Sequence, residues 1–282
     1  MWDKVTSLRE TLTEMGSVLV AYSGGTDSTF LLRMAQDVLG DQALGVMVIS
    51  PLVTDDEVQE AADIAAAIGA RLAVLRSTGV LEEIAVGATA AAGDFEAAFG
   101  DARILDNSVD RCYYCKAAIC ARLNAYAMEH GYSVIVDGSN LDDLGDYRPG
   151  QRAARECGMR SPLQEVGFTK AQIRAAAHEM GLPNWDKPSS ACLASRIPYG
   201  TPLTREVLSK VGQGEEILRG FGFQQLRVRH HGDVARIEIP TEDFALLLER
   251  REQAVEAFKA LGYAYVTLDL KGFRSGSMNE VI

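Results

Sequence analysis

A short glycine-rich stretch near the start of this 282-residue chain has the residue types of an anion-binding loop. It spans residues 23–28 (SGGTDS), between an apolar run and a stretch with helical spacing. Glycines let backbone N–H groups approach a phosphate, and the start of a helix adds partial positive charge. Ser23 and Ser28 can donate hydroxyl hydrogen bonds, and Asp27 can hold Mg²⁺ beside a polyphosphate. An ordinary strand-to-helix turn would also fit, and the stretch lacks the Gly-Lys-Ser/Thr ending of a Walker A loop.

Three cysteines form a second candidate site. Cys112 and Cys115 make a CxxC pair, and Cys192 lies far along the chain. Two thiolates at this spacing can share one metal or one cluster edge, and folding can add a third. Three ligands would leave one open iron in a [4Fe-4S] cluster, which could carry hydrosulfide. Reduced core cysteines, a redox pair, a zinc site lacking a ligand and a persulfide relay are the alternatives. Cys120 and Cys157 are expected to be small buried hydrophobes.

Arginines make a third candidate site in the last quarter of the chain. Arg227 and Arg229 alternate along one expected strand and therefore share a face, and Arg236 lies on the next strand. The planar guanidinium group suits phosphate and carboxylate groups. A solvated or salt-bridged strand face, with Asp233 and Glu238 as partners, is the alternative.

The elements that must position these residues follow two patterns. In the first two thirds, short apolar runs alternate with helical spacing, as in the helix expected at residues 55–68. This order favours an α/β fold with a parallel sheet and helices on both faces. The glycine-rich loop follows the first strand, where nucleotides bind in such sheets. The expected strands are residues 17–22, 44–49, 71–75 and 133–136.

From about Thr204 the pattern changes to helix, strand, strand, helix, strand. This order predicts a smaller α+β C-terminal domain, so the expected domains are residues 1–200 and 201–282. The Ala-rich residues 85–98 are expected to be helical. The elements expected in the second domain are helices at 206–218 and 242–261 and strands at 226–231, 234–239 and 264–270.

Composition excludes several classes of protein. Hydrophobic residues make up 47% and charged residues 24% of the chain, which is typical of globular proteins rather than disordered or fibrous ones. The net charge of −11 argues against nucleic acid as a partner. No apolar run approaches the roughly 20 residues of a membrane-spanning helix, and the first residues do not look like a signal peptide. We therefore expect a cytoplasmic protein with no membrane partner.

The SGGTDS loop resembles the signature of the PP-loop ATP pyrophosphatase superfamily, which includes NAD and GMP synthetases and tRNA thiolation enzymes. The resemblance implies an adenine nucleotide α-hydrolase-like fold. It also implies Mg²⁺-dependent use of ATP to adenylate a carbonyl or carboxylate oxygen, with release of pyrophosphate. The residues expected to contact ATP are Ala21, Ser23, Gly24, Gly25, Asp27, Ser28, Ser50 and Gly138.

Further segments are similar to those of the LarE family of sulfur transferases, and the similarity runs from about residue 17 to residue 279. The resemblance implies that a carboxylate of pyridinium-3,5-biscarboxylic acid mononucleotide is adenylated and becomes a thiocarboxylate, in nickel-pincer cofactor synthesis. It also implies a homo-oligomer and an external sulfide donor. The segments that carry it are residues 146–150, 195–201, 227–229, 235–238 and 268–276.

The family has two branches, and this chain departs from one of them. One branch sacrifices the sulfur of its own cysteine, at the position of Ala191 here, and lacks the CxxC pair. The other branch holds a [4Fe-4S] cluster on three cysteines, which implies that Cys112, Cys115 and Cys192 are the ligands. Asp27 is the fourth residue expected to serve catalysis. The resemblance implies substrate contacts from Ser195, Arg196, Arg227, Arg229, Arg236 and Arg274, with Glu215 and Glu238 as Mg²⁺ ligands or orienting groups.

Three other functions remain open from the sequence. A PP-loop tRNA thiolation enzyme would share the loop and the cluster, but it would need a basic surface. An amide ligase of the NAD synthetase type would use ammonia and leave the three cysteines without a role. A nucleotide-sensing module would bind ATP without releasing pyrophosphate.

Overall fold

The computed structural model describes residues 1–76, 81–82, 101–145, 149–188 and 191–274. The chain forms two compact units. The first unit contains residues 1–104 and 110–190, and the second contains residues 105–109 and 191–282. The domain boundary expected between residues 200 and 201 stays a prediction.

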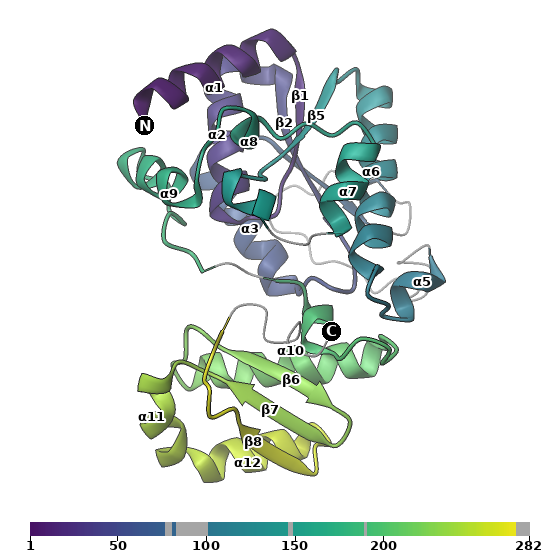
Figure 1. The fold of residues 1–282 in the computed structure, drawn as a ribbon, viewed down its shortest axis with the longest axis vertical. Helices are drawn as coiled ribbons and strands as arrows, with labels where there is room; N and C mark the ends of the chain where they lie inside the picture. Colours follow the sequence, from purple (N-terminus) through teal and green to yellow (C-terminus); the bar gives the residue numbers. More distant parts are fainter. Residues whose placement is uncertain (77–80, 83–100, 146–148, 189–190, 275–282) are drawn as a thin grey trace. The chain divides into compact units, whose positions relative to one another are not determined.

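The sheet of the first unit has the order β4-β3-β2-β1-β5. All neighbouring pairs are parallel except β3 with β4. The chain runs from β1 outwards to β2 and β3, and then returns to β5 on the other side of β1, so the strand order reverses at the β1–β5 pair (Figure 1). The expected α/β class with a parallel sheet is confirmed. The strands are β1 (Val18–Ala21), β2 (Ala43–Ile49), β3 (Leu72–Arg76), β4 (Leu81–Glu82) and β5 (Val134–Asp137).

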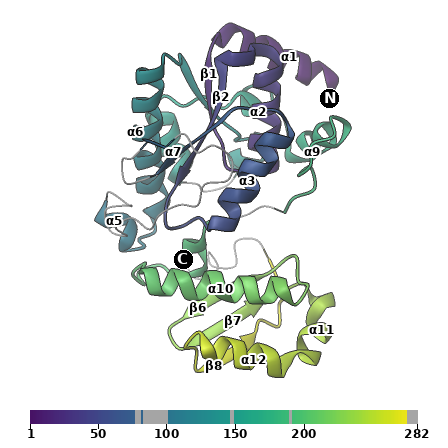
Figure 2. The ribbon, with the colours of Figure 1, turned by 180° about the vertical axis from the view of Figure 1, so that it is seen from behind.

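Helices cover both faces of this sheet because its central strands are apolar on both sides. On one face α1, α2 and α9 pack around Leu8, Phe30 and Phe168, and on the other face α6 and α7 pack around Leu19 and Leu123 (Figures 1 and 2). The helices are α1 (Trp2–Met15), α2 (Thr26–Leu39), α3 (Asp55–Ala67), α6 (Arg111–His130), α7 (Pro149–Glu156), α8 (Pro162–Glu165) and α9 (Lys170–Glu179), with α5 (Ala102–Leu105) and the 3₁₀ turns η1 (Gly40–Gln42) and η2 (Leu141–Gly145) between them.

The second unit contains a small sheet of the order β6-β7-β8, in which β6 and β7 are antiparallel and β7 and β8 are parallel. Its core surrounds Leu218, Val228 and Phe258. The smaller C-terminal α+β fold is therefore confirmed. Its elements are η3 (Leu193–Arg196), α10 (Arg205–Gly220), β6 (Arg227–His231), β7 (Val234–Glu238), η4 (Thr241–Asp243), α11 (Phe244–Glu249), α12 (Arg251–Ala260) and β8 (Tyr265–Leu268).

One expectation about this unit is wrong. The single helix expected at residues 242–261 is two helices, because the backbone of Arg250 (φ −96°, ψ 12°) leaves the helical conformation between α11 and α12. The Ala-rich residues 85–98 lie outside the described residues. Within the described residues, no helix is long and apolar enough to cross a membrane.

Candidate active site

The SGGTDS loop connects β1 to α2 and has a backbone that only glycine allows at one position. Gly24 has a φ of 70°, and a Cβ atom there would lie 2.6 Å from the Cβ atom of Ala61. Gly25 is the N-cap of α2, and no side chain caps this helix end. The loop therefore presents backbone N–H groups at a helix N-terminus, which fits the binding of a phosphate group.

Two serines of the loop bring their hydroxyl groups together. The Oγ atoms of Ser23 and Ser28 lie 3.1 Å apart, and Ser28 Oγ also donates to the carbonyl oxygen of Gly25 at 3.1 Å. These contacts hold both hydroxyl groups beside the N-terminus of α2. They can add hydrogen bonds to an anion on the loop.

Asp27 lies in the first turn of α2, and one of its carboxylate oxygens has no hydrogen-bond partner among the described residues. Oδ2 accepts hydrogen bonds from Asn140 Nδ2 at 3.2 Å and from Lys170 Nζ at 3.1 Å. Oδ1 is buried and has no hydrogen-bond partner among the described residues. A buried oxygen without a hydrogen bond lowers the stability of the fold by about 1–3 kcal/mol unless a ligand binds it. Carboxylate oxygens are ligands that Mg²⁺ prefers. Asp27 therefore fits the predicted role of a Mg²⁺ ligand.

The carboxyl ends of three strands meet beside this loop. Ala21 ends β1 and is paired with Val46 of β2 and with Asp137 of β5. A Cβ atom on Gly138, which follows β5, would lie 2.9 Å from the backbone nitrogen of Ser28, so this position also requires glycine. Ser50 follows the neighbouring strand β2. The structure thus brings the predicted ATP-binding residues to the edge where the strand order reverses.

The CxxC pair begins α6, the helix that packs beside this edge. Cys112 and Cys115 lie near the start of this helix, three residues apart and therefore on one face, and both are half-buried. Lys116 Nζ lies 3.7 Å from Asp137 Oδ2 at the end of β5. An ion pair therefore links the helix that carries the two thiols to the strand end that precedes Gly138.

The third predicted cluster ligand, Cys192, belongs to the second unit. Within either described unit, no three Cys, His, Asp or Glu side chains converge to form a metal site. The donor set of Cys112 and Cys115 fits one edge of a cluster, and the cluster hypothesis requires one ligand from the second unit.

Cys120 and Cys157 do not belong to this set. Cys120 is fully buried in the core of the first unit, as expected, and burial raises the pKa of its thiol to about 12. Cys157 is half-buried, packs against the same core and donates to the carbonyl oxygen of Ala154 at 3.1 Å.

In the second unit, Arg229 and Arg236 lie directly opposite each other on β6 and β7. Both contact Glu238, which is fully buried. Arg229 Nη2 donates to Glu238 Oε2 at 2.7 Å, and Arg236 Nη2 donates to Oε1 at 3.0 Å. Arg229 Nη1 also donates to the carbonyl oxygen of Ser195 at 2.9 Å. Glu238 thus orients two guanidinium groups that the family resemblance assigned to the substrate, and it is one of the salt-bridge partners that the sequence offered as the alternative.

Arg196 is 2% exposed and forms a two-pronged ion pair with the buried Glu215. Its Nε and Nη2 atoms donate to the two carboxylate oxygens at 2.8 and 3.0 Å. Its Nη1 atom donates to Ser195 Oγ at 3.0 Å, to the carbonyl oxygen of Cys192 at 3.1 Å and to that of Ala191. These contacts support a positioning role for Arg196, because its donors already hold the turn that carries Cys192.

The arginine face of the second unit consists of the arginines on β6 and β7 together with Arg196, Arg219 and Arg274. Its charges favour the binding of an anion. Burial, together with the charge of Arg196, lowers the pKa of Arg227 to about 10, and its guanidinium group lies 5.2 Å from the ring centre of Phe273. Burial opposes the charge of Glu215, but hydrogen bonds and the charge of Arg196 outweigh it and lower its pKa. Guanidinium groups outnumber carboxylates in this set, which consists of Arg196, Arg219, Arg227, Arg229, Arg236 and Arg274 with Glu215, Glu238 and Asp269.

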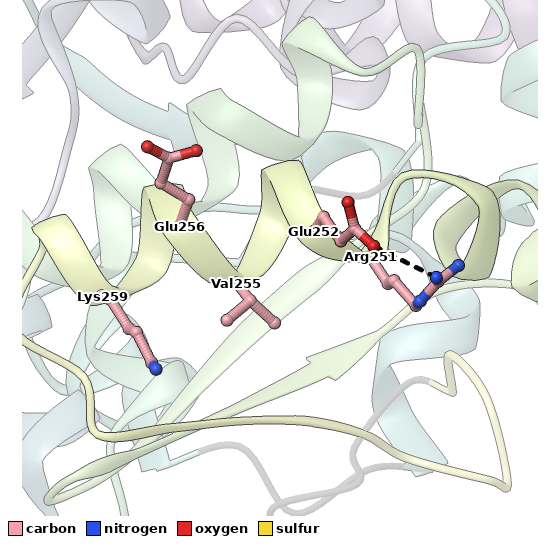
Figure 3. Close-up of a pocket in the computed structure, with 5 residues that line it drawn as sticks. All are labelled: Arg251, Glu252, Val255, Glu256 and Lys259. Carbon is pink, nitrogen blue, oxygen red and sulfur yellow. Dashed lines mark hydrogen bonds and ion pairs between the residues drawn. The ribbon is translucent and has the colours of Figure 1, made fainter.

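The second unit also has a surface hollow along α12, drawn in Figure 3. An ion pair of 3.2 Å between Arg251 and Glu252 lies at one end of it. None of the predicted site residues lines this hollow, and its mixed charges surround only one apolar side chain, that of Val255. It therefore carries no functional assignment.

Sequence reasoning missed four residues that support the SGGTDS loop. Asn140 and Lys170 contact Asp27, while Asn184 Nδ2 and Lys187 Nζ donate to the carbonyl oxygen of Gly24 at 3.0 and 3.4 Å. Asn140 could have been found, because it closely follows a strand whose carboxyl end lies at the nucleotide edge. The other three carry no local signal.

Comparisons with known proteins agree with this geometry. Residues 2–106 match the NAD synthase family. Over 280 residues the chain is 40% identical to the pyridinium-3,5-bisthiocarboxylic acid mononucleotide synthase of Lactiplantibacillus plantarum, which covers 99% of this chain and 95% of that protein. An uncharacterised protein of Synechocystis is 38% identical over 281 residues, covering 99% and 98% of the two chains. One from Methanocaldococcus jannaschii is 27% identical over 258 residues, covering 92% and 91%. The chain therefore belongs to the LarE family, the family of the pyridinium-3,5-bisthiocarboxylic acid mononucleotide synthase.

Proposed function

We propose that this protein is an ATP-dependent sulfur transferase that converts a carboxylate of pyridinium-3,5-biscarboxylic acid mononucleotide to a thiocarboxylate. The observation that carries the proposal is the SGGTDS loop at the strand-order reversal, with the buried Oδ1 of Asp27, which accepts no hydrogen bond from the described part of the chain. The name of the Lactiplantibacillus relative supports the class of product.

The first step would be adenylation. The loop N–H groups and the hydroxyl groups of Ser23 and Ser28 would bind the phosphates of ATP, and Asp27 would hold Mg²⁺ there. Mg²⁺ neutralises the charge that develops on the leaving pyrophosphate. A substrate carboxylate oxygen would attack the α-phosphorus and expel pyrophosphate. The carboxylate oxygen then leaves as AMP, a much better leaving group than oxide.

The arginine face of the second unit would bind the phosphate and a carboxylate of the mononucleotide. Ser195, Arg227, Arg229, Arg236 and Arg274 would make these contacts. The buried carboxylate of Glu238 holds the guanidinium groups of Arg229 and Arg236 in place before the substrate arrives, so little ordering entropy is lost on binding. Arg196 would act indirectly, through the turn that contains Ser195. An excess of positive charge on this face supports the assignment in a chain whose net charge is −11.

Cys112, Cys115 and Cys192 would hold a [4Fe-4S] cluster. When bound by three thiolates, such a cluster has one open iron at which hydrosulfide can be supplied. Attack of hydrosulfide on the acyl carbon would expel AMP and give the thiocarboxylate. Cys112 and Cys115 lie three residues apart on α6, which supports their sharing one edge of such a cluster.

A test follows directly. Anaerobic protein is incubated with Mg·ATP, the mononucleotide and sulfide, and both pyrophosphate and the mass of the product are measured. We expect pyrophosphate only when the mononucleotide is present, and a product in which sulfur has replaced oxygen. Pyrophosphate release that does not depend on the mononucleotide would contradict the proposal.

The match to the NAD synthase family favours an amide-forming ligase as a second candidate. This enzyme would attack the same adenylate with ammonia. Replacing sulfide by an ammonium salt in the same incubation separates the two, because the ligase would then give an amide. The homo-oligomer, the cytoplasmic location and the absence of a nucleic-acid partner stay predictions.

A further inference from the structure

The two carboxylate oxygens of Asp27 have different surroundings. Oδ2 accepts two hydrogen bonds, from Asn140 and Lys170, whereas Oδ1 is buried and accepts none from the described residues. Buried carboxylate oxygens in proteins normally accept at least one hydrogen bond, so Oδ1 of Asp27 is an exception that calls for an explanation. The asymmetry points to a ligand on Oδ1 and a separate role for the groups on Oδ2.

Asn140 has only one possible orientation toward Asp27. Its side chain is 1% exposed, and its Oδ1 atom accepts the backbone N–H of Asp142 at 3.0 Å. Its own N–H donates to Asp143 Oδ2 at 2.9 Å, and its carbonyl oxygen accepts from Gln164 at 3.1 Å. Because the amide oxygen faces Asp142, the NH₂ group must face Asp27. Asn140 therefore fixes Oδ2 without adding charge.

Lys170 adds a positive charge to the same oxygen. It is the first residue of α9, where a capping box of Thr169 and Gln172 fixes the start of the helix. Its backbone N–H donates to Asp142 Oδ2 at 2.8 Å, and its ammonium group forms an ion pair of 3.1 Å with Asp27. The side chain is 35% exposed, so a phosphate group on the loop could also reach it.

We propose that Lys170 is a counter-ion that makes metal binding at Asp27 depend on the nucleotide. Without nucleotide, the ammonium group neutralises the carboxylate, and a divalent cation gains little by binding there. A polyphosphate on the loop adds several negative charges, which outweigh that of Lys170. Cation and nucleotide then bind together. This inference rests on the proposed function, in which the loop binds Mg·ATP.

The sign of the effect follows from electrostatics. An ammonium group within hydrogen-bond distance of a carboxylate repels an incoming divalent cation, and the repulsion is strong in a partly buried site. Removing this charge should therefore strengthen cation binding in the nucleotide-free protein. It should also weaken nucleotide binding, because the polyphosphate loses a cation. A merely structural role for Lys170 predicts no gain in cation affinity.

The experiment uses Mn²⁺ as a probe, with free Mn²⁺ measured by electron paramagnetic resonance. The full chain is titrated with and without α,β-methylene-ATP, which cannot release pyrophosphate. The variants are Lys170→Met, the charge-conserving Lys170→Arg, and Asp27→Ala. Lys4→Met is the matched control, because Lys4 donates to Gln172 near the start of the same helix at 2.9 Å but does not contact Asp27.

We expect wild-type protein to bind Mn²⁺ weakly alone and tightly with the nucleotide. Without nucleotide, Lys170→Met should bind Mn²⁺ about tenfold more tightly than wild type. The nucleotide should increase the Mn²⁺ affinity of this variant by a smaller factor than that of wild type. Lys170→Arg and Lys4→Met should behave as wild type. Unchanged or weaker nucleotide-free binding in Lys170→Met would overturn this proposal alone. Equal Mn²⁺ binding by wild type and Asp27→Ala with nucleotide would overturn the proposed metal site as well.

Discussion

The SGGTDS loop of the first unit and the arginine face of the second unit are built in opposite ways. The loop uses backbone N–H groups, two hydroxyl groups and Gly24, which lies close to Ala61; Gly138, which follows β5, lies close to Ser28. The arginine face uses charged side chains held by the buried carboxylates of Glu215 and Glu238. The anion-binding groups of the loop are adjacent in sequence, whereas the guanidinium groups of the arginine face come from separate elements and depend on the carboxylates that hold them. Substitutions in the two regions should therefore fail in different ways.

The largest effect is expected at the loop. Asp27→Ala should abolish pyrophosphate release at saturating Mg·ATP, since it removes the proposed Mg²⁺ ligand, while circular dichroism remains that of wild type. Asp37→Ala is the matched control, because Asp37 lies on the same helix and its side chain forms an ion pair with Arg33, away from the loop. Near-wild-type turnover of Asp27→Ala would remove this residue from the site.

The cysteines come next. Cys112→Ser, Cys115→Ser and Cys192→Ser should each lose iron and sulfur transfer together, because two thiolates hold a cubane cluster poorly. Cys120→Ser and Cys157→Ser should retain both. Iron content and the absorbance spectrum of anaerobically purified protein provide the measurement. Full iron content in the Cys192→Ser protein would show that the second unit supplies no ligand.

Arg227→Leu should separate substrate binding from stability. Loss of a charge-assisted phosphate contact costs about 1.5–3 kcal/mol, so the KM for the mononucleotide should rise on the order of tenfold to a hundredfold. The ligand-free protein should become more stable, by on the order of 1 kcal/mol, since burial disfavours the charge of Arg227. Steady-state kinetics and thermal unfolding test the two parts. A higher KM for ATP instead would assign Arg227 to the nucleotide.

The smallest expected effect is a change in pH dependence at Glu215. Its pKa is lower in the folded protein than in the unfolded chain, so the unfolded chain binds more protons near pH 4. The stability from this group is complete above the ordinary glutamate pKa and is lost as the pH falls below it. Glu215→Gln should therefore unfold at a lower temperature than wild type at pH 7, and the difference should shrink only as the pH falls below the ordinary glutamate pKa of 4.5. A difference that stays constant with pH would contradict the ion pair.

The same contrast explains how much could be predicted from the sequence. The loop, the parallel sheet and the small C-terminal sheet were predictable because their signals are local. The Lys170–Asp27 ion pair joins residues distant in sequence and has no local signal. The family resemblance assigned Arg196 to the substrate, and only the fold shows that its donors hold Glu215 and the turn at Cys192. The helix expected at residues 242–261 was wrong because apolar periodicity continues across the break at Arg250.

In the proposed reaction, ATP adenylates the mononucleotide and thereby activates it for sulfur transfer. The most direct measurement is the ratio of pyrophosphate to thiocarboxylate over many turnovers of anaerobic protein supplied with sulfide, with the protein mass followed in parallel. We predict one pyrophosphate for each thiocarboxylate formed and an unchanged protein mass. Thiocarboxylate formed without ATP, or a single turnover with loss of one sulfur from the protein, would contradict it.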